Sequence, residues 1–348
     1  MIPNFISFPA HIIVGEISIN QSRYFLHFLK PNTFRPYIKH GLSFFIRYHA
    51  TLALANFYLI LINIYEIGIL KQIKKNPIRL KNGCLIHVPE NDWGIGKELL
   101  HGYREKYASE YLYEFLSKNE VILDIGANIG YYVILEHHAS PESKIYAIEP
   151  VSETVTYLKM NAPQGASIYQ YAISDHDGKV KMYSSERCNL SSVENIHGVD
   201  EHTAEEVPSF TLDTFCENEG IIPTVLRMDT EGHEIQIIKG AKGLIESDLP
   251  LKMFIEHHPC LTGAEAQLEI ADYLQRYEIH PDKIFIGDKP ARKIYVKLMQ
   301  KAEKIRFEHY PQQYMYMSSR EYGKEELDLV LSKSYCCWVF WKRDLKRN

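Results

Sequence analysis

A strand, a glycine turn and a helix follow one another at residues 121–135, and this unit constrains the fold more than any other part of the chain. The apolar run V-I-L-D ends on Asp124, and the turn I-G-A-N-I-G contains Gly126, Asn128 and Gly130. Glycines allow a tight turn and a close approach of a ligand to the backbone, and the free N–H groups at a helix start attract polar groups. The pattern predicts the first βα unit of a doubly wound α/β sheet.

An acidic residue follows the next apolar strand. Residues 144–148 read K-I-Y-A-I, and Glu149 comes 19 positions after Gly130. An acid about 20 residues beyond the turn is typical of a second strand whose carboxylate binds ribose hydroxyls. Asn128 replaces the second glycine of the dinucleotide fingerprint and no third glycine follows, so a pyrophosphate would fit poorly. Either Asp124 or Glu149 alone could be a solvated strand end; together they predict a site for a ribosyl cofactor without a pyrophosphate.

Three further strands are expected to end at the same edge of the sheet. The third, over 167–173, leads into Ser174 and Asp175, which would either meet an adenine ring or form an Asx-type turn. The fourth, over 224–228, is followed by Asp229, Glu231 and His233, and the fifth, over 251–255, by Glu256, His257 and His258. Ligands of open α/β sheets bind beyond the carboxyl ends of the strands. The chain therefore predicts a polar crevice there.

The ordered motifs resemble the FkbM family of S-adenosylmethionine-dependent methyltransferases, which have the class I, Rossmann-like fold. The resemblance covers about residues 97–260 and is carried by these segments: D-I-G-A-N-I-G-Y-Y, I-E-P, A-I-S-D, T-L-D at 211–213, and R-M-D-T-E-G-H-E followed by I-K-G-A. It implies an α/β sheet with helices on both faces. It also implies seven strands, the last of them antiparallel, for which S-Y-C-C-W-V-F-W ending at Trp341 is the candidate.

The resemblance also implies an activity and roles for residues. Members typically methylate hydroxyl groups of sugars, polyketides or related small molecules. Asp124 would hydrogen-bond the methionine end of S-adenosylmethionine, Glu149 would bind its ribose, and Gly126, Asn128 and Gly130 would shape the turn. The expected function is thus O-methyl transfer to a hydroxyl of a sugar, glycolipid or secondary metabolite. A non-catalytic scaffold that binds a nucleoside cofactor, and an NAD-type oxidoreductase or epimerase, remain alternatives.

The general base is left open by the sequence. Asp229 and Glu231 match the family's motif, but carboxylates of ordinary pKa are weak bases at neutral pH, whereas a histidine with a pKa of about 6.5 is better matched. His233 and His257 therefore compete with them for that role. Asp229, Glu231, His233 and His257 could also bind a metal, but no helical H-E-x-x-H pair occurs, and we predict no metal site.

Residues 1–76 are predicted to form a mainly helical extension before a methyltransferase domain at 77–348. The run at 52–70 is apolar but contains Asn56, Asn63 and Glu66, which favours a helix buried against other helices or lying in a membrane interface. Five basic residues and no acid at 71–81 suit contact with anionic head groups or a solvated linker.

The domain itself is expected to begin with a β-hairpin at 77–90 around Asn82-Gly83, a dipeptide suited to a type I′ turn. One helix over 97–117 should follow, and an insertion near 290–330 has no counterpart in the resemblance.

Net charge and cysteine content limit the substrate classes and the cellular compartment that we expect for the chain. The chain of 348 residues has a net charge of −5 and lacks an N-P-P-Y motif after the fourth strand, which argues against nucleic-acid substrates. Its 6 cysteines show no C-x-x-C spacing, which favours a reducing compartment. We expect a cytoplasmic protein, in contact with a membrane surface if residues 52–81 bind one, acting on a small-molecule or glycan hydroxyl acceptor. The oligomeric state is not predictable from the sequence.

Overall fold

The computed structural model describes most of the chain from residue 77 onward. The described residues are 46–55, 57, 58, 60, 61, 64, 77–89, 93–99, 102–183, 193, 204–286, 321–333 and 336–344.

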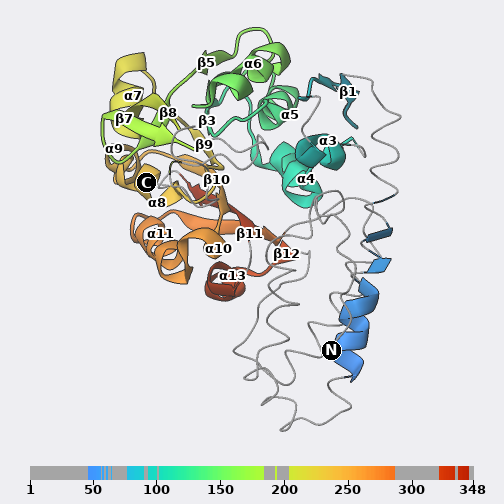
Figure 1. Cartoon of the computed structure of the whole chain (residues 1–348). Helices are drawn as coiled ribbons and strands as arrows, with labels where there is room; N and C mark the ends of the chain where they lie inside the picture. The colour runs from blue at the N-terminus through green and yellow to red at the C-terminus, as the bar shows by residue number, and fades with distance from the viewer. Residues whose placement is uncertain are drawn as a thin grey trace.

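An eight-stranded mixed sheet forms the centre of the molecule, with the strand order β12-β11-β13-β10-β9-β3-β4-β5 (Figure 1). Five neighbouring strands, β10 to β5 in this order, run parallel, and β13 pairs antiparallel with both β10 and β11. The predicted α/β fold class is therefore confirmed, including the antiparallel final strand. The sheet has one strand more than the expected seven because the short β12 pairs with β11 at the edge.

The strands of this sheet are β3 (Val121–Ile125), β4 (Lys144–Ile148), β5 (Ser167–Tyr169), β9 (Val225–Met228), β10 (Leu251–His257), β11 (His280–Ile286), β12 (Glu321–Tyr322) and β13 (Cys337–Arg343). Central strands are apolar almost throughout because helices cover both of their faces, as parallel sheets require. In β3, Leu123 and Ile125 pack into one core and Ile122 into the other, as the alternation of strand side chains dictates.

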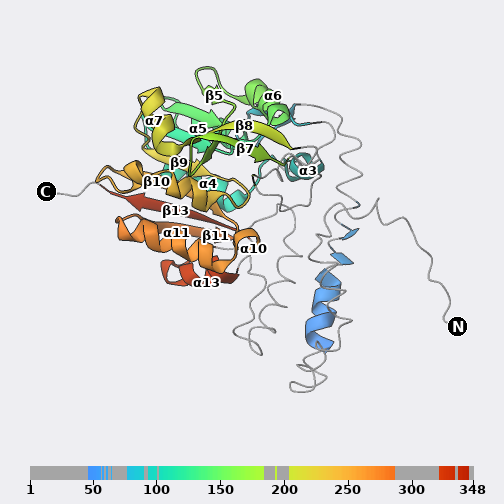
Figure 2. The same cartoon turned by 60° about the vertical axis from the view of Figure 1, so that its left-hand side comes forward.

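Helices form a layer on each face of the sheet (Figure 2). One core lies under α7 (Leu212–Glu219), α8 (Glu234–Lys239), α9 (Lys242–Ile245), α11 (Ala264–Arg276) and α13 (Leu327–Lys333). The other lies under α3 (Trp93–Leu99), α4 (Lys106–Phe115), α5 (Tyr131–Ala139) and α6 (Ser152–Asn161). Short helices α10 (Pro259–Thr262) and η4 (Lys324–Glu326) lie in connections.

The entry to the domain differs from the sequence prediction in two details. The hairpin is present as β1 (Ile78–Arg79) and β2 (Leu85–Ile86), but Arg79 faces Leu85, so the loop has five residues and is not a two-residue type I′ turn. Of Asn82 and Gly83, only Gly83 has a positive φ, of 89°.

The helix expected over 97–117 is divided into α3 and α4. Gly102 at φ 79° and Glu105 at φ 42° turn the backbone between them, because a residue in the left-handed region cannot continue a right-handed helix.

The third strand expected over 167–173 is also two strands. Only β5 (Ser167–Tyr169) belongs to the central sheet, whereas β6 (Ala172–Ser174) joins β8 (Glu205–Thr211) and β7 (Gly178–Met182) in a separate three-stranded sheet of order β6-β8-β7. Apolar character alone does not reveal the change of partner at residues 170–171, since both segments combine apolar residues in a way that suits a strand.

The N-terminal extension is helical at residues 46–55, and the remainder up to residue 76 lies largely outside the described residues. Large apolar side chains of this stretch are half-exposed: Ile46, Leu54, Phe57, Leu61 and Ile64. Ala55 in the same helix is completely buried, so the described residues leave both predicted placements of this helix open. Within them, no helix combines the length and apolar character that crossing a bilayer requires. Of the insertion predicted near 290–330, residues 287–320 lie outside the described part.

Candidate functional site

Two acids lie on either side of the glycine turn that follows β3. Asp124 is completely buried and Glu149 nearly so, at 6% exposed. The Glu149 carboxylate accepts hydrogen bonds from the backbone N–H of Asn128 at 2.9 Å and of Val151 at 3.0 Å. Burial raises the pKa of Glu149 to about 7, with a further contribution from the negative charges of Asp124 and Asp229, although the two backbone hydrogen bonds oppose the shift. The predicted pair of acids therefore meets at one turn.

Gly126 is the residue at which the turn touches the next loop. Its φ is 79°, and a Cβ placed on it would lie 2.0 Å from the carbonyl oxygen of Asp229. A side chain is thus excluded for two reasons, the left-handed backbone and the contact with backbone of the fourth strand's loop. Gly130 is similarly enclosed, since its Cβ would lie 2.9 Å from Cδ1 of Leu158. The turn and the residues after β9 are consequently packed together.

Arg227, on the fourth strand β9, binds Asp124 at the end of β3. Its Nη1 donates to Asp124 at 2.9 Å and to the Gly126 carbonyl at 3.0 Å, and its Nη2 donates to Asp229 at 2.8 Å. Burial disfavours the charged guanidinium, but Asp124 and Asp229 outweigh it and raise the pKa of Arg227. Burial also raises the pKa of Asp124, and Arg227 opposes that shift. The sequence did contain a signal for this residue, because an arginine inside an apolar strand requires a buried acidic partner.

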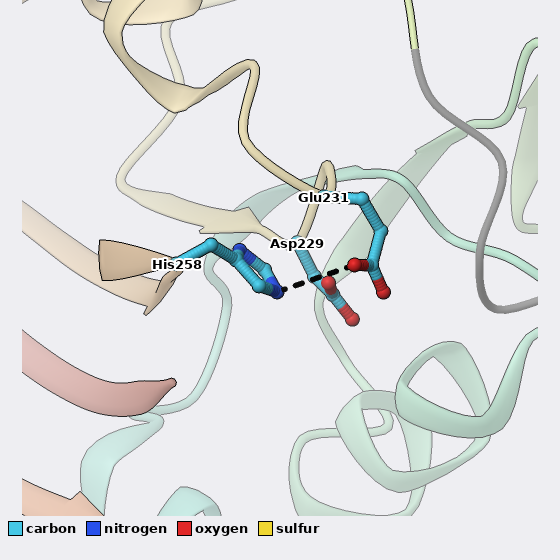
Figure 3. Close-up of side chains that lie close together, drawn as sticks. All are labelled: Asp229, Glu231 and His258. Atoms are coloured by element: carbon cyan, nitrogen blue, oxygen red, sulfur yellow. Dashed lines mark ion pairs between the residues drawn. The ribbon is translucent and has the colours of Figure 1, made fainter. Parts of the chain in front are cut away.

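A cluster of three side chains, Asp229, Glu231 and His258, lies beyond the ends of β9 and β10 (Figure 3). One ligand atom from each lies within 4.8 Å of those of the other two. Nδ1 of His258 is 2.9 Å from Oε1 of the buried Glu234, and its Nε2 is 3.7 Å from Oε2 of Glu231. Glu256, two residues before His258 and the second-to-last residue of β10, is 3.6 Å from the same Nε2. We call Asp229, Glu231 and His258 the acid–histidine cluster.

Two members of the cluster and two carboxyl groups beside it have strongly shifted pKa values. Burial by itself disfavours a charged imidazole, but Glu234, Glu231 and Glu256 outweigh it and raise the pKa of His258 well above its usual value. Burial raises the pKa of Glu231 to about 8, against the attraction of His258. Burial also raises the pKa of Glu256. Glu234 is the reverse case, since its bond to His258 outweighs burial and lowers its pKa to about 2.

The two histidines predicted as rival bases lie apart from this cluster. His257 is the last residue of β10 and lies on the opposite face from Glu256, as strand alternation requires, and its Nδ1 is 2.5 Å from Oε1 of Gln267 on α11. His233 is buried with Nε2 2.9 Å from the hydroxyl of Ser174. Burial lowers the pKa of both imidazoles, that of His257 to about 4. The structure brings Asp229 and Glu231 together as predicted and joins them to His258 instead.

Ser174 and Asp175 stand at the end of β6 and not at the edge of the central sheet. The Ser174 hydroxyl contacts His233 and, at 3.3 Å, Oδ1 of Asp175, whose side chain is 43% exposed. The expected adenine contact depended on a strand of the central sheet ending at these residues, but β6 belongs to the three-stranded sheet. Their role in cofactor binding stays a prediction.

The connection between α3 and α4 contributes residues that sequence reasoning missed. The hydroxyl of Tyr132 donates to Glu105 at 2.5 Å, and the backbone N–H of Arg104 donates to the hydroxyl of Tyr131 at 2.9 Å. The ring of Tyr132 in turn lies 4.2 Å from the guanidinium carbon of Arg227. Arg104 and Glu105 also interact electrostatically with Asp229. These contacts hold the α3–α4 connection beside Arg227 and Asp229.

The T-L-D segment has a structural explanation. The hydroxyl of Thr211 caps α7 by accepting from the Thr214 N–H at 3.1 Å, and the Asp213 carboxylate accepts from the N–H groups of Gly243 and Leu244. Asp213 thereby joins α7 to the start of α9.

Comparison with known proteins identifies the domain that contains this site. The sequence profile of the methyltransferase FkbM domain matches residues 124–279, from Asp124 to the residue before β11. Residues 124–279 are a methyltransferase domain of the FkbM family. The family's methyl donor is S-adenosylmethionine, as the resemblance implied.

Among curated proteins, the chain is similar to the hexuronic acid methyltransferase AglP of Haloferax volcanii. The two are 25% identical over 140 residues, which cover 39% of this chain and 56% of the relative. The chain thus spans about half the length of the curated relative it matches.

Among solved structures, the chain is similar to methyltransferase FkbM of Methylobacillus flagellatus KT, with a TM-score of 0.38, 13% identity, and coverage of 66% of this chain and 50% of the other. It is also similar to TYW2 of M. jannaschii in complex with AdoMet, with a TM-score of 0.35, 12% identity, and coverage of 75% and 84%.

The residues around the turn fit S-adenosylmethionine. Oδ2 of Asp124 is buried and, in the described part of the chain, accepts no hydrogen bond. An unsatisfied buried carboxylate oxygen is costly, and an ammonium group such as that of the cofactor's methionine moiety would satisfy it. Each Glu149 oxygen has received one backbone hydrogen bond and retains a further lone pair for a ribose hydroxyl.

Proposed function

We propose that this protein is an S-adenosylmethionine-dependent O-methyltransferase that acts on a hydroxyl group of a sugar, glycolipid or secondary metabolite. The observation that carries the proposal is the contact between Gly126 and the Asp229 carbonyl, which places the acid–histidine cluster directly beside the turn that would hold the methyl donor. The FkbM domain supports methyl transfer, and the similarity to a hexuronic acid methyltransferase favours a sugar-like acceptor.

Bound S-adenosylmethionine supplies an electrophilic methyl group on a positively charged sulfur. The acceptor oxygen forms a bond to that carbon as the carbon–sulfur bond breaks, and the electron pair of that bond stays on sulfur. The protein's main task is then to hold the reacting atoms in line at near-attack distance. In this proposal Asp124 and Glu149 fix the donor, and the cluster's oxygen and nitrogen atoms bind the acceptor hydroxyl and take up its proton.

Calorimetric titration of the full chain with S-adenosylmethionine, S-adenosylhomocysteine and NAD tests the donor. We expect the two sulfur nucleosides to bind and NAD not to bind. Binding of NAD alone would replace the proposal with the oxidoreductase alternative. Transfer of a labelled methyl group into a host extract then tests turnover, and binding without any transfer would favour the non-catalytic scaffold.

A membrane-proximal acceptor is a separate part of the proposal. It is supported by the half-exposed apolar side chains at residues 46–64, among them Leu54, Phe57 and Leu61. Flotation of the full chain with anionic vesicles should carry it upward, and a variant with Leu54, Phe57 and Leu61 all changed to Asp should remain at the bottom. Equal flotation of both proteins, or of neither, contradicts membrane contact through this segment.

A further inference from the structure

Nε2 of His258 has an unusual environment for a buried imidazole nitrogen. The His258 side chain is 4% exposed, and the nearest carboxylate oxygens are 3.6 Å and 3.7 Å away, on Glu256 and Glu231. Both distances exceed those of a hydrogen bond. This nitrogen therefore forms ion pairs with two acids, neither at hydrogen-bond distance, at the place where Asp229 and Glu231 present their oxygens (Figure 3).

The spacing of these atoms suits ligands of one ion better than partners of one another. Two ligands at about 2.1 Å from a cation lie about 3.0 Å apart when adjacent and about 4.2 Å apart when opposite. The separation of 3.7 Å between Nε2 of His258 and Oε2 of Glu231 lies within that range. The 4.8 Å limit for the whole cluster requires only a small contraction to match it.

Groups behind the cluster hold two of its members in a ligating orientation. Glu234 binds Nδ1 of His258 at 2.9 Å, which leaves Nε2 directed at the acids. A carboxylate bonded to the far nitrogen of a histidine is the usual support of a metal-bound imidazole. Arg227 likewise holds Oδ2 of Asp229 at 2.8 Å, which leaves its other oxygen for a ligand.

The local charge also calls for a cation. Asp229, Glu231, Glu234 and Glu256 lie around His258. The basic groups near them are Arg227, which also binds Asp124, and Arg104, which interacts electrostatically with Asp229 and Glu231. Acids thus outnumber basic groups in a nearly buried region, and a divalent ion would balance them.

We propose that the carboxylates of Asp229 and Glu231 and Nε2 of His258 bind one divalent cation. Two carboxylates and one imidazole are a donor set for Mn²⁺ or Zn²⁺ rather than for a thiolate-seeking metal. Water completes the coordination, and the acceptor hydroxyl replaces a water when it binds. The assignment of that hydroxyl rests on the proposed function, whereas cation binding itself does not.

Mn²⁺ provides a direct probe, because its six-line electron paramagnetic resonance signal loses intensity when the free ion binds. Titration of the metal-free full chain should reveal one binding site per chain. Glu231→Gln and His258→Asn should each weaken that site at least tenfold, since each removes a ligand. Matched controls, Glu206→Gln and His280→Asn, change exposed residues outside the cluster and should bind as the unaltered protein does.

The outcomes are separable. No Mn²⁺ bound by the unaltered chain, or undiminished binding by both ligand variants, would overturn the cation site. If a ligand variant fails to fold, a Mn²⁺-dependent rise in the melting temperature of the unaltered chain at one bound ion supports the site, and no rise overturns it. S-adenosylmethionine binding is measured on the same sample: a chain that binds the nucleoside but not Mn²⁺ keeps the proposed function and loses only the cation, and the reverse result rejects the function alone.

Discussion

Asp124 and Arg227 lie directly opposite each other on the neighbouring parallel strands β3 and β9, and the Nη1 of Arg227 donates to the Asp124 carboxylate at 2.9 Å. Both side chains are 5% exposed or less. The pair therefore belongs to the core of the sheet as much as to the proposed cofactor site, and Arg227 also binds the glycine turn through the Gly126 carbonyl.

The Asp124–Arg227 pair makes the first prediction one of stability. Arg227→Met should lower the free energy of unfolding by about 3–5 kcal/mol, because it leaves the buried Asp124 without its partner. Asp124→Asn combined with Arg227→Met should recover part of the loss, since the uncompensated charge is gone. Urea denaturation of the single and double variants measures this coupling, and equal losses in both would contradict it.

The second prediction concerns Gly126. Gly126→Ala should destabilise the protein more than Gly165→Ala does. Both glycines have positive φ, at 79° and 98°, so both alanines incur a backbone cost of about 1–2 kcal/mol. Only at Gly126 would the new Cβ meet the Asp229 carbonyl, because no heavy atom lies within 4 Å of the Gly165 position. The difference between their unfolding free energies isolates the steric contact, and identical values would show that the turn can yield.

The third prediction is a pH dependence of donor binding. The pKa of Glu149 is raised to about 7 by burial and by the nearby charges of Asp124 and Asp229. With this pKa, the Glu149 carboxyl is mostly protonated at pH 6 and mostly ionised at pH 8. The ionised carboxylate is the form that accepts hydrogen bonds from both ribose hydroxyls. The affinity for S-adenosylmethionine should rise about tenfold over that interval. In Glu149→Gln the affinity should be low and should lose this rise; a pH profile unchanged by the substitution would assign the titration elsewhere.

The fourth prediction separates the adjacent histidines. His258→Asn should abolish most methyl transfer while leaving S-adenosylmethionine affinity within a few fold, because His258 lies in the acid–histidine cluster and not at the turn. His257→Asn should act mainly on stability, since His257 is completely buried against Gln267. Steady-state kinetics with calorimetric binding and melting curves distinguish the two. A larger loss of transfer in His257→Asn than in His258→Asn would reverse the assignment.

Much of the site could be predicted from the sequence because its signals are local. Asp124 and Gly126 belong to one strand–turn–helix unit and Glu149 follows the next strand, and the periodicity and spacing of these elements are visible in the chain. The order of polar strand ends predicts which carboxylates share an edge of the sheet, and Asp229 and Glu231 do lie there.

Other features depend on the direction of side chains and on distant partners. The choice of His258 over His257 depends on the end of β10: His257 is the last residue of the strand and binds Gln267, whereas His258 follows the strand and meets the acids. Arg227 was missed because its partner Asp124 is 103 positions away along the chain. The separation of β6 from β5 depends on pairing with β8, and nothing in the local sequence specifies that partner.

Short-range patterns were enough to predict the α/β class, the glycine turn and the two acids beside it, since such patterns encode strands, turns and helices. The folded structure was needed to show which histidine faces the acids, how Arg227 joins Asp124 to Asp229, and that the α3–α4 connection reaches the site through Glu105 and Tyr132. These relationships arise from packing between residues far apart in the chain. Buried polar groups require hydrogen-bonding partners, and local sequence patterns do not predict which distant residue supplies them.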